Sequence, residues 1–134
     1  MKILVGYNAT DGGTEGLKLA LQHAQAFNAE VILLASLMIG DEGHAFKSNT
    51  MDDAKQRVAE AKKSFEAAGI ACRTEILVRG RSPGEDIVQY AKENQIDLII
   101  IGVRIRSRLG KVLLGSTAQY VIIEAPCPVL TFKS

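Results

Sequence analysis

Apolar residues gather in three short runs that predict strands covered on both faces. KILVGY (2–7), EVILLASL (30–37) and DLIII (97–101) are nearly continuous apolar runs, a pattern typical of parallel strands in the middle of a sheet. CRTEILVR (72–79) alternates apolar and polar residues instead and predicts a strand at the edge of the sheet. PVLTF (128–132) opens with proline, which suits the first residue of a strand. The chain therefore contains five predicted strands.

Helical periodicity fills the segments between these strands. A first helix is predicted from about Gly13 to Phe27, and a second begins at Asn49 or Thr50 and ends at Gly69. Their apolar stripes are Leu17, Ala20, Leu21, Ala24 and Phe27 in the first, and Met51, Ala54, Val58, Ala61, Phe65 and Ala68 in the second.

A third helix is predicted to begin near Pro83, because proline suits the first turn, and a fourth follows Ser116. The third helix should carry Ile87, Tyr90 and Ala91 inward. Strands and helices then alternate along the whole chain, which predicts a doubly wound α/β fold around a parallel sheet. The polar stretch 38–50 is the longest connection and the one expected to move most.

Length and charge narrow the classes of protein that this chain can represent. The 134 residues fit one domain, 1–134, and 47% hydrophobic with 23% charged residues is ordinary for a globular fold. A net charge of +1 argues against nucleic acid and an anionic membrane surface as partners. Since no apolar run approaches the length of about 18–20 residues that spans a bilayer, we expect a cytoplasmic protein. Cys72 and Cys127, far apart and without metal-type spacing, are expected to be reduced thiols rather than zinc ligands.

The candidate chemistry lies in GVRIRSRLGKVLLGST (102–117), between the fourth strand and the last helix. Ligands of open α/β sheets bind beyond the carboxyl ends of the strands, where this stretch begins. Backbone N–H groups at a helix start, next to the hydroxyls of Ser116 and Thr117, suit an anion. The stretch is therefore a candidate phosphate-binding loop.

The chain resembles the universal stress protein family along its whole length. The resemblance is carried by ILVGYN at the start, VRGRSPGEDIVQYA (78–91), DLIIIG (97–102), and LLGSTAQYVI and APCPVL near the end. Nucleotide-binding members have a glycine, two residues, a second glycine, nine residues, and then glycine with Ser or Thr. Here Gly102, Gly115 and Ser116 match that pattern, whereas Ile105 stands at the second glycine.

The resemblance implies a fold, a ligand and a partner. The fold is a five-stranded parallel sheet of order 3-2-1-4-5 with helices on both faces, and the ligand is ATP or AMP, with Mg²⁺ as a possible companion. The partner is a second copy of the chain, bound through the last strand at Val129, Leu130, Thr131 and Phe132. The implied nucleotide-binding residues are Tyr7, Asn8, Ala9 and the backbone at Ser36 for adenine and ribose, and Gly102, Gly115, Ser116 and Thr117 for the phosphates. The cationic side chain of Arg104 is added to the phosphate set from its chemistry alone.

Two substitutions depart from the nucleotide-binding pattern. Asn8 stands where ATP-binding relatives usually carry aspartate, which replaces a carboxylate by an amide at the ribose. Ile105 is β-branched, and such a residue tolerates neither a positive φ nor a close approach to phosphate. In the other direction, Arg104 and the basic residues at 106, 108 and 111 add cations that can bind phosphate.

Other functions remain open at this point. The basic stretch can equally be a solvated loop or part of a dimer interface, and Ser116 and Thr117 can simply cap the last helix. A slow ATP hydrolase would need Asp11 or Asp41 to hold Mg²⁺. A third possibility is a dimeric adaptor that binds no nucleotide. His23 and His44 are interpreted as surface residues. The segment 80–82 before Pro83 is interpreted as a turn and helix start, with a second set of ligand-facing groups as the alternative.

Overall fold

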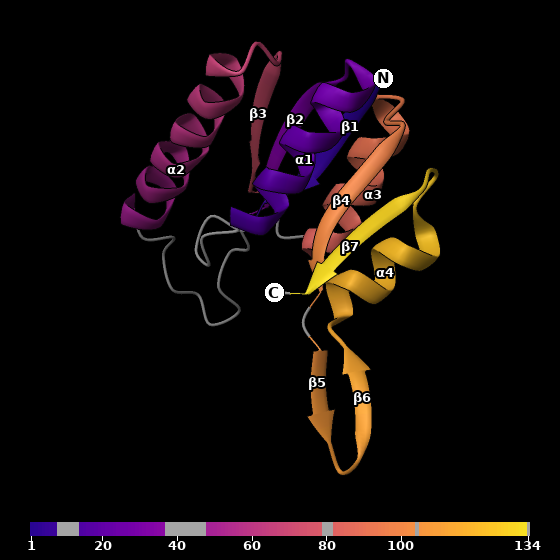
Figure 1. Ribbon diagram of the computed structural model, residues 1–134. Coiled ribbons are helices and arrows are strands. Elements are labelled where there is room, and N and C mark those ends of the chain that lie inside the picture. The colour runs from indigo at the N-terminus through magenta and orange to yellow at the C-terminus, as the bar shows by residue number, and fades with distance from the viewer. Residues whose placement is uncertain (8–13, 37–47, 79–81, 104, 134) are drawn as a thin grey trace.

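The structure is a computed structural model that describes residues 1–7, 14–36, 48–78, 82–103 and 105–133 (Figure 1). Its elements are β1 (Lys2–Gly6), α1 (Thr14–Phe27), β2 (Glu30–Ser36), α2 (Ser48–Ala67), β3 (Cys72–Leu77), α3 (Pro83–Glu93), β4 (Leu98–Val103), β5 (Ile105–Arg108), β6 (Lys111–Leu114), α4 (Ser116–Glu124) and β7 (Val129–Lys133). All five predicted strands are present, with their ends within two residues of the expected ones.

The main sheet has the order β3-β2-β1-β4-β7, and every neighbouring pair of strands is parallel. Because β7 is the fifth of the predicted strands, this order confirms 3-2-1-4-5 and places β3 at an edge, as its alternation indicated. Successive β1 residues point to opposite faces, and Ile3, Leu4 and Val5 are all buried. The apolar runs are therefore explained by two cores, one on each face of the sheet.

The helices divide evenly between these two faces (Figure 1). α1 and α2 cover one face, where Ala24, Val58 and Phe65 pack against Val5 and Leu33. On the other face, α3 and α4 pack with Ile87, Ala91 and Val121 against Leu4 and Ile99. This division follows from the strand order. From β1 to β3 the chain adds strands in one direction, and from β3 to β7 it adds them in the other, so right-handed crossovers place α3 and α4 on the face opposite α1 and α2.

The predicted helix stripes are confirmed except at their last residues, Phe27 and Ala68. Ala20 and Ala24 of α1 are buried, but Phe27 is 58% exposed because it lies in the last turn, at the mouth of a surface groove. Ala68 is exposed beyond the end of α2. That helix begins at Ser48, so Asn49 and Thr50 lie inside it rather than before it. Gly69, with φ of +77°, ends it as expected.

The segment after β4 is a β-hairpin, which corrects the expectation of a simple loop. β5 and β6 pair in antiparallel fashion, with Ile105 opposite Leu114 and Arg108 opposite Lys111. Leu109 and Gly110 form the turn, with φ of +52° and +75°. Two consecutive residues at positive φ are the geometry of a type I′ turn, whose twist suits two-residue hairpins.

Candidate functional site at the carboxyl ends of the strands

The carboxyl ends of β1, β2 and β4 meet at one edge of the sheet, and α3 and α4 begin there. Of the predicted nucleotide-binding residues, Tyr7, Ser36, Gly102, Gly115, Ser116 and Thr117 lie at this edge. Asn8, Ala9 and Arg104 lie outside the described residues, as do Asp11, Asp41 and His44 and most of the stretch 38–50.

The hairpin brings the two halves of the predicted phosphate loop together. Ile105 and Leu114 are paired partners. The segment that follows β4 therefore lies beside the segment that precedes α4. Paired residues of antiparallel strands lie about 4.5–5.5 Å apart between Cα atoms. Gly115 directly follows Leu114, and Gly102 lies three residues before Ile105, so both glycines lie near the base of the hairpin.

The start of α4 presents backbone donors at the same place. Its N-cap is Gly115, in an extended conformation with φ of −61° and ψ of 153°, and none of the side chains that the structure describes caps the helix. The expectation that Ser116 or Thr117 is the cap is therefore wrong, because the chain turns into the helix one residue earlier. The first N–H groups of a helix have no intrahelical acceptor and carry the positive end of its dipole. Ser116 is exposed and Thr117 half-buried beside them.

The start of α3 packs closely against the start of α4. A Cβ atom at Gly84 would lie 3.2 Å from Cβ of Tyr120 and 3.4 Å from the backbone oxygen of Thr117. The absence of a side chain at Gly84 thus lets two helix N-termini converge on the same edge. Ser82 accepts a hydrogen bond from the N–H of Glu85 and caps α3, which confirms its interpretation as a helix-start residue.

Tyr7 contributes backbone rather than its ring to this edge. Its N–H donates to the oxygen of Leu34 at 2.9 Å, while its side chain, 9% exposed, belongs to the core under α1 and α2. Burial is the main cause that raises the pKa of the Tyr7 hydroxyl. Arg57 of α2 lowers this pKa and Glu60 of α2 raises it, both by smaller amounts. The ring thus lies on the face of the sheet opposite α3 and α4.

A buried carboxylate at this edge was not predicted. Asp86, in the first turn of α3, is only 2% exposed, and its Oδ2 accepts a hydrogen bond from Oγ of Ser36 at 2.5 Å. Among the residues that the structure describes, its Oδ1 has no hydrogen-bond partner. An unpaired oxygen on a buried carboxylate is costly, which makes Asp86 a candidate functional residue beside the end of β2. The signal available in the sequence was the spacing, since Asp86 lies one helical turn before the inward-facing Tyr90.

The described residues contain no group of three or more His, Cys, Asp or Glu side chains that could hold a metal ion. His23 is half-buried on α1, with Nδ1 in a hydrogen bond to the oxygen of Leu19, so it is not a fully solvated surface residue. Among the helices that the structure describes, none is both long and apolar enough to cross a membrane.

Comparison with known proteins gives one consistent family. The model of the universal stress protein family matches residues 1–133. A universal stress protein of Thermus aquaticus is 33% identical, covering 98% of this chain and 97% of that protein. The structure is similar to that of a universal stress protein from Archaeoglobus fulgidus, with 32% identity, a TM-score of 0.80, and 98% and 97% of the two chains covered.

A universal stress protein from Archaeoglobus fulgidus has also been solved in complex with dAMP. That structure is 29% identical to this chain, with a TM-score of 0.76, and the match covers 98% of this chain and 96% of the other.

Proposed function

The chain belongs to the universal stress protein family, and on this basis we propose that it binds an adenine nucleotide, ATP or AMP, at the carboxyl edge of its sheet. The observation that carries the proposal is the pairing of Ile105 with Leu114, which holds the end of β4 beside the start of α4. An anion bound between them meets the N–H groups of the α4 start, a favourable arrangement for phosphate. The dAMP complex of a relative with the same fold supports the choice of ligand.

The residues at this edge divide between the two ends of the ligand. We assign the phosphates to Gly102, Arg104 and the start of α4, namely Gly115, Ser116 and Thr117. Adenine and ribose are assigned to the ends of β1 and β2, namely Tyr7, Asn8, Ala9 and Ser36. In this arrangement Asp86 acts as a positioning residue, because its carboxylate accepts the hydrogen bond that orients the Ser36 hydroxyl. Mg²⁺, if it takes part, arrives with the phosphates.

The protein is further proposed to act as a cytoplasmic, homodimeric module of the stress response. β7 is an edge strand of the sheet, and Val129, Leu130 and Phe132 are only partly buried. An unpaired edge strand of this kind favours pairing with a second copy. The four residues Val129–Phe132 are the proposed contact.

Released ligand is the first test of nucleotide binding. The purified protein is denatured and any released nucleotide is identified by chromatography. Thermal melting is then followed with ATP, AMP and dAMP, with and without Mg²⁺. A ligand at a hundred times its dissociation constant should stabilise the fold by about 2.7 kcal/mol.

One substitution separates binding from folding. Ser116→Asp places a carboxylate at the start of α4. The helix dipole stabilises this negative charge, but the charge repels a phosphate. We expect unchanged or higher stability without ligand and loss of the nucleotide-induced shift. Ser64→Asp, at an exposed position of α2, is the control for added charge and should retain that shift. A wild-type protein whose melting responds to no nucleotide would favour a ligand-free adaptor instead.

A further inference from the structure

The β5–β6 hairpin projects from the body of the protein, beyond the carboxyl ends of β4 and β7 (Figure 1). A strand of four residues spans roughly 13 Å, so its turn lies well away from the sheet. Isolated two-stranded hairpins are at best marginally stable in water. A projecting hairpin is therefore expected to gain stability from a surface that it contacts.

The tip of the hairpin carries a residue that the turn itself does not favour. Leu109 has a φ of +52° and is 98% exposed. Left-handed backbone costs a residue such as leucine about 1–2 kcal/mol, whereas Asn or Gly occupies it readily. An exposed leucine gains nothing from burial to offset this cost. Because neither turn geometry nor packing within the chain explains Leu109, its side chain is a candidate contact.

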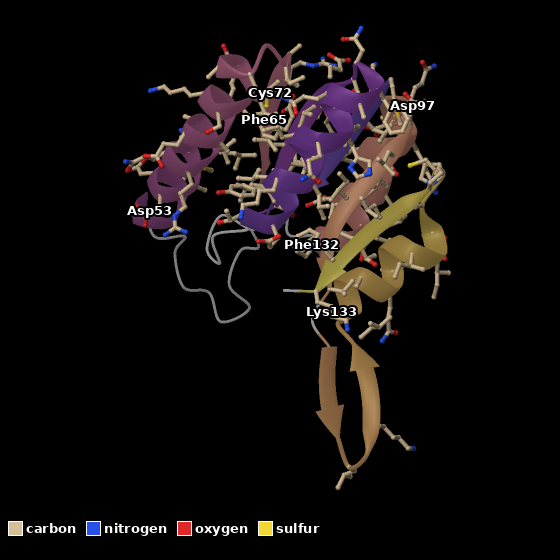
Figure 2. The ribbon with its side chains drawn as sticks, viewed as in Figure 1. Asp53, Phe65, Cys72, Asp97, Phe132 and Lys133 are labelled. Atoms are coloured by element: carbon tan, nitrogen blue, oxygen red, sulfur yellow. The ribbon has the colours of Figure 1, made fainter. Side chains whose placement is uncertain are left out.

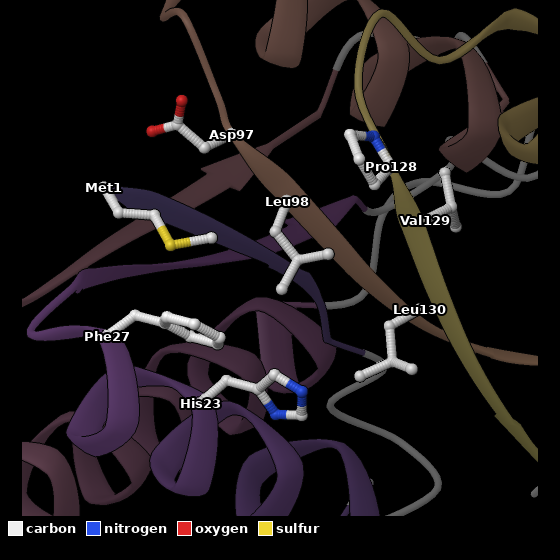
Figure 3. Close-up of a pocket in the computed structure, with 8 residues that line it drawn as sticks. All are labelled: Met1, His23, Phe27, Asp97, Leu98, Pro128, Val129 and Leu130. Atoms are coloured by element: carbon white, nitrogen blue, oxygen red, sulfur yellow. The ribbon is translucent and has the colours of Figure 1, made fainter.

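A complementary surface lies at the opposite end of the same molecule, where Figure 2 labels Asp97, and Figure 3 shows the residues that line it. It is a groove of about 390 Å³ between α1 and the amino-terminal ends of β4 and β7. Met1, Phe27, Leu98, Pro128 and Leu130 give it mainly apolar walls, and Asp97 supplies a carboxylate at one end. Asp97 is exposed and accepts a hydrogen bond from the N–H of Lys2 through Oδ2.

The hairpin tip and the groove match in chemistry. Leu109 is an apolar knob, and Lys111, two residues further along, is an exposed cation. The groove offers an apolar hollow with an exposed anion. The tip cannot enter the groove of its own chain, because the six residues of β4 separate Leu98 in the groove from the base of the hairpin.

A two-fold dimer through β7 brings the tip of one chain toward the groove of the other. A two-fold axis perpendicular to the strands makes the two copies of β7 antiparallel, so Lys133 of one copy faces the region of Val129 in its partner. The hairpin begins beside the carboxyl end of β7, and Val129 lines the groove. Antiparallel pairing thus places each hairpin next to the groove of the other chain, and symmetry provides the contact twice.

We propose that the β5–β6 hairpin is a dimerisation arm that inserts Leu109 into the α1–β7 groove of a second copy of this chain, with Lys111 facing Asp97. This inference rests on the homodimer of the proposed function and adds to it a second, reciprocal contact. It also couples the dimer to the nucleotide site, because the base of the arm is the proposed phosphate loop.

The test is the dissociation constant of the dimer, measured by sedimentation velocity on the full chain. Leu109→Asn keeps a residue that accepts the left-handed turn and removes the apolar knob. We expect this variant to weaken the dimer at least about tenfold, since burying a leucine is worth about 1.5–3 kcal/mol. Ala59→Asn, at an exposed position of α2, is the control, because α2 packs over β2 and β3 at the other edge of the sheet from β7, and it should leave the constant unchanged.

The groove side is tested with Phe27→Asn, which is expected to weaken the dimer similarly. The double variant should then be little weaker than either single one, because both changes break the same contact. Phe27 is exposed at the mouth of the groove, so unfolding is not expected, and circular dichroism verifies this.

Each outcome supports or overturns the arm. A dimer that dissociates equally in wild type and Leu109→Asn overturns the arm but leaves the β7 dimer standing. A wild-type chain that stays monomeric at all concentrations overturns both. If Leu109→Asn lowers nucleotide affinity and leaves dimerisation unchanged, the hairpin is a ligand lid and the arm is again wrong. Nucleotide binding is measured separately, so a protein that binds no nucleotide neither supports nor overturns the proposed contact of the hairpin.

Discussion

The tight packing at Gly6 gives the sharpest quantitative prediction about the edge of the sheet that holds the candidate site. Gly6 ends β1, and a Cβ atom there would lie 2.9 Å from Cδ1 of Ile87 and 3.0 Å from Cγ2 of Ile101. The first distance is shorter than Cβ atoms show in folded proteins, and the second is at that limit. Gly6→Ala therefore forces the side chains of Ile87 and Ile101, or the elements that carry them, to shift.

The magnitude follows from two opposing effects. Overpacking of a core costs about 1–3 kcal/mol, while replacing glycine by alanine at a compatible φ restricts the unfolded chain and returns about 0.4–1 kcal/mol. We expect Gly6→Ala to lower the free energy of unfolding by about 1–2 kcal/mol. For a domain of this size, that corresponds to a fall in Tm of roughly 3–8 °C. Urea unfolding followed by circular dichroism measures the difference.

A double-mutant cycle identifies the atom responsible. Ile87→Val removes Cδ1, the atom nearest to the new methyl group, and alone costs about 0.5–1.5 kcal/mol. In the double variant the alanine fills the vacated space, so the combined loss should be smaller than the sum of the single losses. Gly69→Ala is the control, because it introduces strain at a φ of +77° in open space and should add independently to Ile87→Val. Additive losses for the Gly6 pair would refute the steric explanation.

Two other predictions concern buried polar groups. Ser36→Ala removes the hydrogen-bond partner of the buried Asp86 carboxylate and should lower the free energy of unfolding, measured in urea, by about 1–3 kcal/mol. The neutral isostere Asp86→Asn should lower it by less. A larger loss for Asp86→Asn than for Ser36→Ala would contradict this explanation. Burial raises the pKa of the Cys72 thiol to about 11, with smaller opposing effects from Lys62 and Glu66. In the unfolded chain this thiol loses its proton near pH 9, so its contribution to stability is complete below that pH and is lost as the pH rises toward 11. Cys72→Ala should flatten the fall of stability between pH 9 and 11, and a slope unchanged from wild type would argue against it.

Local pattern was sufficient for the strands of the main sheet, for the four helices and for their sequence along the chain. The apolar runs at β1, β2 and β4, the alternation in β3 and the stripe in α2 each reflect burial on a given face, and burial leaves a period in the sequence. The sheet order was reached through the family resemblance, and the edge position of β3 agreed with it. The glycine spacing of Gly102 and Gly115 gave the proposed position of the phosphate loop, which stays a prediction.

Other features depend on contacts between residues far apart in the chain, which leave no local period. The Ser36–Asp86 hydrogen bond joins residues fifty positions apart, and Phe27 is exposed because the groove ends at the last turn of α1. The hairpin was missed because leucine at a left-handed turn position contradicts the usual turn residues. Sequence thus determined which segments form the main sheet and the helices, since each of these buries its own face. Tertiary structure alone decided which polar groups meet at the carboxyl edge and which apolar surfaces stay uncovered, because packing between distant segments sets both.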